Sequence, residues 1–222
     1  MVWPGTHTVV VPNPDLKPEK SLNYEAGSSF KADGVFGSDD HLFAKAVFFY
    51  DDVKDFIAPK AWLEPTTPPT LYYSSQNVGH VVRKGIELSG TYAAGQFSTS
   101  VSYGLLHAVD KETNERMNGI TPQSANLKLA YAFPAQAINV WYRAHWSKGG
   151  ESSVEDRATG KKLHFSSFLT HSLGAEWSPK VADLANLQAG IAVVNLFDKE
   201  YRMLNGSYGS GRGVRLWLSA QF

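Results

Sequence analysis

The stretch that decides the fold is SANLKLAYAFPAQAINVWYRAHW, residues 124–146. Its first half places apolar residues at every second position from Ala125 to Phe133, with polar or small residues between them. Its second half repeats this alternation from Ile138 to Trp146. Side chains alternate between the two faces of a β-strand, so the stretch predicts two strands that each have one apolar face. A tight turn that begins with proline would join them.

The same alternation recurs along the whole chain. At the C-terminal end, Val214, Leu216 and Leu218 oppose Arg215 and Trp217. Alternating segments of about ten residues are typical of strands that cross an outer membrane. The sequence therefore predicts an all-β fold, a transmembrane antiparallel β-barrel, to which this chain contributes nine strands. The expected strands are 19–32, 41–57, 71–92, 96–107, 123–133, 136–147, 164–177, 187–197 and 212–222.

The connections between these strands alternate between short and long. The shorter turns are expected at 33–40, 93–95, 134–136 and 178–186. The long polar loops are expected at 58–70, 108–122, 148–163 and 198–211. Outer-membrane barrels have short turns toward the periplasm and longer loops outside the cell. Residues 1–18 are therefore predicted to form an extracellular loop, and residues 19–222 to supply the nine strands.

Aromatic residues collect at both ends of the predicted apolar faces. One group is expected at the periplasmic rim: Phe30, Tyr92, Phe97, Phe133, Trp177 and Phe222. Another is expected at the outer rim: Tyr50, Tyr103, Trp146 and Phe165. Aromatic rings favour the boundary between lipid headgroups and hydrocarbon, which accounts for two such belts. A soluble two-sheet sandwich is the alternative, and it gives no reason for aromatic residues at both ends of one face.

Composition narrows the classes of function. The chain has 222 residues with 21 basic and 21 acidic ones, a balance that gives no sign of a nucleic-acid partner. It has no cysteine, which excludes thiolate metal sites and disulfides. No apolar run reaches the roughly 18 residues of a membrane-spanning helix, and no apolar signal-peptide segment follows Met1. Because nine is an odd number of strands, the chain is expected to be a piece of a larger exported barrel.

Three separated motifs resemble one family of outer-membrane proteins. Residues 12–27 read PNPDLKPEKSLNYEAG, which is similar to the family's NPxLKPE…YExG entry to a late barrel strand. Residues 72–90 read YYSSQNVGHVVRKGIELSG, which resembles its YxNxG…GxE strand. Residues 195–201 read NLFDKEY and are followed by Gly211-Arg212, which resembles its final motif. The chain thus resembles the C-terminal barrel portion of TonB-dependent outer-membrane receptors.

This resemblance implies a fold, a location and an activity. The whole barrel would have about 22 strands, of which this chain would hold the last nine. The receptor would lie in the cell outer membrane, in contact with its lipid, and would import an iron-bearing ligand actively. It would depend on TonB through N-terminal regions and a plug domain, which this chain is expected to lack. No catalytic arrangement stands out in the sequence, so no enzyme is predicted; an adhesin or a barrel enzyme is the less favoured alternative.

The resemblance extends to receptors for haem. His7 stands shortly before Asn13-Pro14-Asp15-Leu16, which resembles the family's NPNL box with Asp in place of the second Asn. This implies that His7 is an axial ligand of haem iron, because a neutral imidazole nitrogen binds that metal well. No intrinsic cofactor is expected, and haem or a haemoprotein would be the transported ligand. A ferric-siderophore receptor is the alternative.

A second group of candidate ligand-binding residues flanks the predicted 148–163 loop. Alternation places His145 and His164 on the lumen side of neighbouring strands, where they could meet, and Arg143 lies two residues from His145 on the same face. Such a cluster could bind an acidic group of a ligand. The alternative is an ordinary polar wall, which every barrel lumen of this kind has.

Overall fold

The computed structural model describes residues 7–64, 70–77, 79–117, 119–155, 161–180 and 186–221. Its regular elements are β-strands, apart from one 3-10 turn at Pro134–Gln136. Within the described residues, no helix has the length and apolar character required to span a membrane. The chain divides into two compact units, and each is treated by itself. They comprise residues 1–24, 50–84 and 108–116 in the first unit, and residues 25–49, 85–107 and 117–222 in the second.

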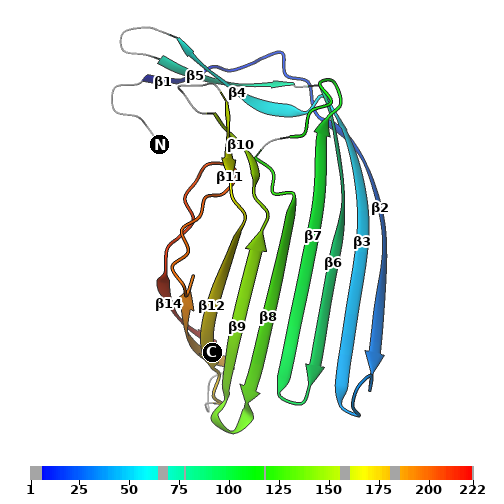
Figure 1. Cartoon of the computed structure of the whole chain (residues 1–222), viewed down its shortest axis with the longest axis vertical. Helices are drawn as coiled ribbons and strands as arrows, with labels where there is room; N and C mark the ends of the chain where they lie inside the picture. The colour runs from blue at the N-terminus through cyan, green and yellow to red at the C-terminus, as the bar shows by residue number, and fades with distance from the viewer. Residues whose placement is uncertain are drawn as a thin grey trace. The chain divides into compact units, whose positions relative to one another are not determined.

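Nine strands form one large sheet in the order β14-β13-β12-β9-β8-β7-β6-β3-β2 (Figure 1). Every pairing described here within this sheet is antiparallel. Each strand overlaps one of the nine predicted segments, and the all-β antiparallel fold is confirmed. The bounds are β2 Lys20–Asp33, β3 Asp40–Lys54, β6 His80–Ala94, β7 Phe97–Asp110, β8 Gln123–Phe133, β9 Ile138–Ser147, β12 Phe168–Trp177, β13 Asn186–Val194 and β14 Gly213–Gln221.

The strand register gathers apolar side chains on one face of this sheet in the second unit. One row of directly paired residues runs Leu129, Tyr142, Leu173, Val193 and Val214 across five strands. Each member is apolar or aromatic, as alternation predicts. We call the side that carries this row the apolar face.

Among the residues that the structure describes, many side chains of the apolar face are exposed. Leu173 is 45% exposed, and Leu216 and Leu218 are each 75% exposed. Phe97, Phe133 and Trp177, each at the end of its strand, are also exposed. A soluble sandwich buries such a face, and soluble proteins rarely expose apolar patches of this extent. The exposed apolar face therefore excludes the sandwich and fits a sheet surrounded by lipid. Phe222, predicted to belong to the same aromatic belt, lies outside the described residues.

The opposite face, which we call the polar face, carries a row of hydrogen-bonded side chains. The Asn126 side-chain amide donates to Ser102 Oγ at 3.2 Å. The Asn126 Oδ1 atom lies 2.8 Å from His145 Nδ1. Nearby on the same face, Lys128 is paired directly with Arg143. Hydrophilic side chains on this face are what a water-lined barrel interior requires.

Part of the polar face is flat because indole rings lie over glycines. The Trp141 ring covers Gly174 on the neighbouring strand, and a Cβ atom at Gly174 would lie 2.4 Å from that ring. The Trp217 ring covers Gly190 in the same way, at 2.1 Å. Trp141 packs with Ala130 and Ala192 in the small buried core of this unit. A ring over a glycine restores the contact that the missing side chain would have made.

Short strands occupy several segments that were expected to be loops. In the first unit, β1 His7–Val10 and β4 Ile57–Glu64 lie largely in the loops predicted at 1–18 and 58–70. They form a sheet in the order β1-β5-β4 with β5 Thr70–Asn77, which covers the start of the predicted strand 71–92. The predicted strands 41–57 and 71–92 are therefore each too long. They are broken at Asp55 and Gly79, which have φ angles of 55° and 47°. A residue in this left-handed region cannot continue a strand, so the chain turns there.

In the second unit, β10 Gly150–Glu155 and β11 Lys162–Phe165 form a hairpin in the predicted 148–163 loop. The predicted strand 164–177 is therefore divided, because residues 166 and 167 separate β11 from β12. This division changes which side chains share a face, and it bears on one of the predicted site residues.

The turn that joins β2 to β3 is organised by one carboxylate. Asp40 is 2% exposed, and it accepts hydrogen bonds from the backbone N–H groups of Val35 (2.6 Å), Phe36 (2.7 Å) and Gly37 (2.9 Å) and from the Tyr92 hydroxyl (3.0 Å). It stands at the first residue of β3, outside the membrane-spanning part. Burial disfavours its charged form, but these four donors outweigh burial and lower the pKa of Asp40 below its ordinary value of 3.8.

We expect Asp40→Asn to loosen this turn, because an amide accepts these N–H groups less strongly than a carboxylate. Hydrogen exchange at residues 35–37 should become faster, whereas Asp39→Asn should leave it unchanged. A lowered folded-state pKa means that the stabilisation is present above pH 3.8 and is lost as the pH falls through the folded-state value. Equal exchange in the two variants would contradict this role for Asp40.

Candidate ligand-binding site

The segment between β13 and β14 is held in a defined shape by the asparagine of the NLFDKEY motif. Asn195 is 6% exposed and has a left-handed backbone, with φ 48°. Its side-chain amide donates to the carbonyl oxygens of Lys199 (2.9 Å) and Ser210 (3.0 Å). Its Oδ1 atom accepts the Lys199 N–H at 2.9 Å. Asparagine tolerates the left-handed region, and its side chain offers both hydrogen-bond donors and an acceptor. All of these properties are used at this position.

Other motif residues join the two arms of the segment. Asp198 Oδ1 accepts the backbone N–H of Arg212 at 2.7 Å. The Tyr201 ring lies against Gly209, where a Cβ atom would be 2.1 Å from the ring. The Gly209 N–H also donates to the Tyr201 carbonyl oxygen at 2.9 Å. The motif therefore fixes the base of a small hairpin, residues 201–209, which we call the 201–209 hairpin.

The tip of the 201–209 hairpin is anchored as well. The Met203 N–H donates to the Ser207 carbonyl oxygen at 2.9 Å. Leu204 is 6% exposed, and its carbonyl oxygen accepts a hydrogen bond of 2.6 Å from the hydroxyl of Ser152 on β10, a side chain with no exposed surface. Because base and tip are both tied down, the hairpin holds its side chains in fixed positions.

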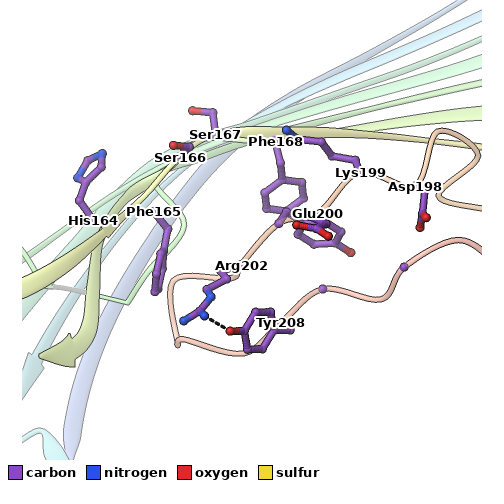
Figure 2. A pocket seen from close by; sticks show the side chains of 13 residues that line it. His164, Phe165, Ser166, Ser167, Phe168, Asp198, Lys199, Glu200, Arg202 and Tyr208 are labelled. Carbon is purple, nitrogen blue, oxygen red and sulfur yellow. Dashed lines mark hydrogen bonds between the residues drawn. The ribbon is translucent and has the colours of Figure 1, made fainter. Parts of the chain in front are cut away.

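A cavity of about 700 Å³ lies between this hairpin and the chain around Ser166 (Figure 2). We call it the aromatic cavity. Its walls combine aromatic rings with a few charged groups, a mixture typical of ligand sites. The lining residues are His164, Phe165, Ser166, Ser167, Phe168, Asp198, Lys199, Glu200, Tyr201, Arg202, Tyr208, Gly209 and Gly211.

Arg202 is the cationic centre of the aromatic cavity. Its guanidinium carbon lies 3.9 Å from the centre of the Tyr208 ring and 5.7 Å from the centre of the Phe165 ring. It also donates to the Tyr208 hydroxyl, as Figure 2 shows. Among the described residues, no carboxylate pairs with it. Two rings therefore hold the guanidinium by cation–π contact while its charge has no acidic partner there.

A second cavity, of about 290 Å³, shares part of this wall. Phe168 and Tyr201 line both cavities, and their rings are stacked with centres 4.1 Å apart. The second cavity also includes His145 and Lys148. The two cavities thus meet along one aromatic pair on the polar face.

The structure does not bring His145 and His164 together. His145 is paired with Thr170, and its ring centre lies 5.9 Å from that of Phe168. His164 is paired with Glu151 on β10. In Figure 2 the His164 imidazole points away from Phe165 and Arg202. The interruption after β11 reverses the alternation, so counting residues from β12 places His164 on the wrong side.

Arg143, the third residue of that group, lies on the polar face outside both cavities. It is paired with Lys128 and Ser172, and its guanidinium carbon is 5.3 Å from the centre of the Trp141 ring. Like Arg202, it rests over an aromatic ring, but on the flat part of the wall.

His7 belongs to the first unit, where it begins β1 and its backbone is paired with Thr70. The orientation of its side chain lies outside the described residues. The NPDL segment that follows is bound to β5: the Asn13 side-chain amide donates to the Ser75 carbonyl oxygen at 2.9 Å. Asn77 Oδ1 accepts the Lys17 N–H at 2.8 Å. Two of the sequence motifs therefore bind one another, which gives both a structural role.

Phe165, Arg202 and Tyr208 did not stand out in the sequence as a site. The 198–211 segment reads as a polar loop, and Arg202 follows the NLFDKEY motif directly without belonging to it. Only the folded hairpin places its guanidinium between two rings. No group of three or more His, Asp or Glu side chains suited to a metal ion occurs in the described part of the chain. The aromatic rings that line the cavity are suited to the organic part of a ligand.

Comparisons with known proteins agree with this architecture. Residues 3–196 match the family described as TonB dependent receptor-like, beta-barrel. The heme/hemopexin utilization protein C of Haemophilus influenzae (strain 86-028NP) is 26% identical, over 93% of this chain and 29% of that protein. The hemin receptor of Yersinia pestis is 22% identical, over 96% of this chain and 30% of that protein. The copper transporter OprC has a similar fold, with a TM-score of 0.72 and 19% identity, over 92% of this chain and 31% of that chain. The chain thus spans about 30% of the length of these relatives.

Proposed function

The chain belongs to the TonB-dependent receptor β-barrel family, and on this basis we propose that the complete receptor imports haem as an iron source. The protein is located in the cell outer membrane, where lipid covers its apolar face. Haem would bind from outside the cell and pass along the polar face. The receptor would depend on TonB and on a plug domain, and it would break no covalent bond in its ligand.

The single observation that carries the transport proposal is the two-sided sheet. Leu173 and Val214 expose one apolar side, while Ser102, Asn126 and His145 form a hydrogen-bonded row on the other. A wall of this kind separates lipid from an aqueous passage. The choice of haem is supported by the two relatives above, whose names state heme and hemin.

His7 remains the proposed axial ligand of the haem iron. In the complete receptor, we expect His7→Ala to weaken haem binding about tenfold and to alter the Soret band, because the iron loses one of its axial ligands. Glu112→Gln in the same unit provides a control that alters an exposed side chain unrelated to the metal. Haem titration followed by absorbance measures both effects, and an unchanged affinity and spectrum would remove His7 from the site.

Growth separates haem from a ferric siderophore as the imported ligand. A strain that relies on the complete receptor for iron should grow on haem as its sole iron source. The same strain should gain nothing from ferric siderophores. Growth on a siderophore but not on haem would replace the proposal with its alternative.

A further inference from the structure

We infer that the 201–209 hairpin recognises a carboxylate of a planar aromatic ligand, with Arg202 as its partner. The inference rests on the proposed import of haem, a porphyrin with two carboxylates, and it assigns the residues that read the organic part of that ligand. Phe165, Arg202 and Tyr208 form the recognising group. None of them belongs to the NLFDKEY motif that holds the hairpin.

The charge of Arg202 favours an anionic ligand. A guanidinium offers a planar fork of N–H donors that matches a carboxylate. One donor is used on the Tyr208 hydroxyl, and no carboxylate of the described residues takes the others. Of the two acidic residues in the motif, Asp198 accepts the Arg212 N–H. Glu200 also lines the cavity but forms no ion pair with Arg202 among the described residues. An anionic group of a ligand would therefore complete the arrangement.

The aromatic rings of the cavity favour a planar ligand. Phe165 and Tyr208 lie near the guanidinium (Figure 2). The stacked Phe168–Tyr201 pair lines the same cavity. Flat apolar walls favour a flat ligand, because stacking needs two planar partners. A volume of about 700 Å³ is also in the usual range for small organic ligands. A porphyrin carboxylate combines the flat surface and the negative charge that the cavity selects.

The 201–209 hairpin is held at both ends, which favours binding. Asn195 and Asp198 fix its base, and the hydrogen bond from Ser152 to Leu204 fixes its tip. Arg202 is thus positioned before a ligand arrives, and little side-chain freedom remains to be lost on binding. The motif residues supply the scaffold, and the residues beyond the motif supply the specificity.

Metal-free protoporphyrin IX tests this inference, because its binding depends on no iron ligand. The complete receptor, its Arg202→Gln variant and its Arg212→Gln variant are titrated with protoporphyrin IX and with its dimethyl ester. Arg212→Gln removes the same charge from the same segment and retains the backbone N–H that Asp198 accepts. We expect Arg202→Gln to weaken binding of the diacid by about tenfold to a hundredfold, as for loss of a charge-assisted hydrogen bond. Binding of the ester should not change, and Arg212→Gln should bind both as the unaltered receptor does.

Two results would overturn the inference. One is equal affinity of Arg202→Gln and the unaltered receptor for the diacid. The other is an equal loss for diacid and ester, which would mean that Arg202 supports the cavity without meeting a carboxylate. Unfolding of each variant in urea checks that the barrel remains intact. Growth on haem distinguishes the two proposals: if the unaltered receptor supports growth but Arg202→Gln binds the diacid normally, the import proposal stands and this inference fails.

Discussion

Replacing Gly174 by valine is expected to destabilise the complete receptor by about 3 kcal/mol, the upper range for overpacking a close-packed site. A Cβ atom at this position would lie 2.4 Å from the Trp141 ring and 3.0 Å from the Ala192 side chain. The ring cannot remain over the glycine, and it is only 8% exposed where it packs with Ala130 and Ala192. The predicted damage comes from lost space alone, since Gly174 does not have a left-handed backbone.

The neighbouring residue on the same strand provides the control. Ala175 points to the apolar face, where its strand partners are Val140 and Ile191. Ala175→Val ends in the same side chain and adds two methyl groups toward lipid, and we expect its stability to remain within about 0.5 kcal/mol of the unaltered receptor. Urea unfolding in lipid vesicles measures both variants.

A second substitution separates loss of space from a change in strand propensity. In a Trp141→Ala background the ring is absent, so Gly174→Val should cost much less than it does alone. The two changes would then be strongly non-additive. If Gly174→Val lowers stability equally with and without Trp141, the close approach of ring and glycine is not the cause.

Alternation in the sequence predicted the strands and their faces well, because it depends only on neighbours along the chain. Leu129 and Val214 were assigned to apolar strand faces from period two, and the register places them in one row on the apolar face. The resemblance to TonB-dependent receptors is likewise confirmed, since its motifs are read directly from the residues. Both inferences used local information that folding does not alter.

The sequence could not give the contacts between strands. Gly174 and Trp141 are 33 positions apart, and only the register of β9 with β12 makes them neighbours. The face of the sheet on which His164 lies was predicted wrongly for a related reason. The interruption at residues 166 and 167 breaks the alternation, and two serines do not indicate an interruption in the sequence. Arg202 gained significance only from the hairpin that carries it. The candidate site could therefore be found only from the three-dimensional structure, whereas the fold class could be predicted from the sequence.

Charge on the apolar face should have a large effect of another kind. Val101 lies on that face, 50% exposed, and is paired with Leu127. In the membrane its side chain would be surrounded by hydrocarbon. Val101→Arg is therefore expected to destabilise the receptor by about 2–4 kcal/mol, the range for arginine on the lipid side of a barrel near the bilayer midplane.

The next residue along the strand, Ser102, provides the control. Ser102 points to the polar face, where it accepts a hydrogen bond from Asn126 and shares a hollow with Lys45 and Glu87. Ser102→Arg adds the same charge to the same strand, but on the water-lined side, where Glu87 can offset it. We expect a loss below about 1 kcal/mol, the cost of one exposed polar contact. Unfolding of both variants in vesicles tests the assignment of the two faces. Arginines at adjacent positions should lower stability by different amounts only if lipid borders one face of the sheet and water the other. Equal losses would mean that the apolar face does not meet hydrocarbon, and the import proposal would fail with it.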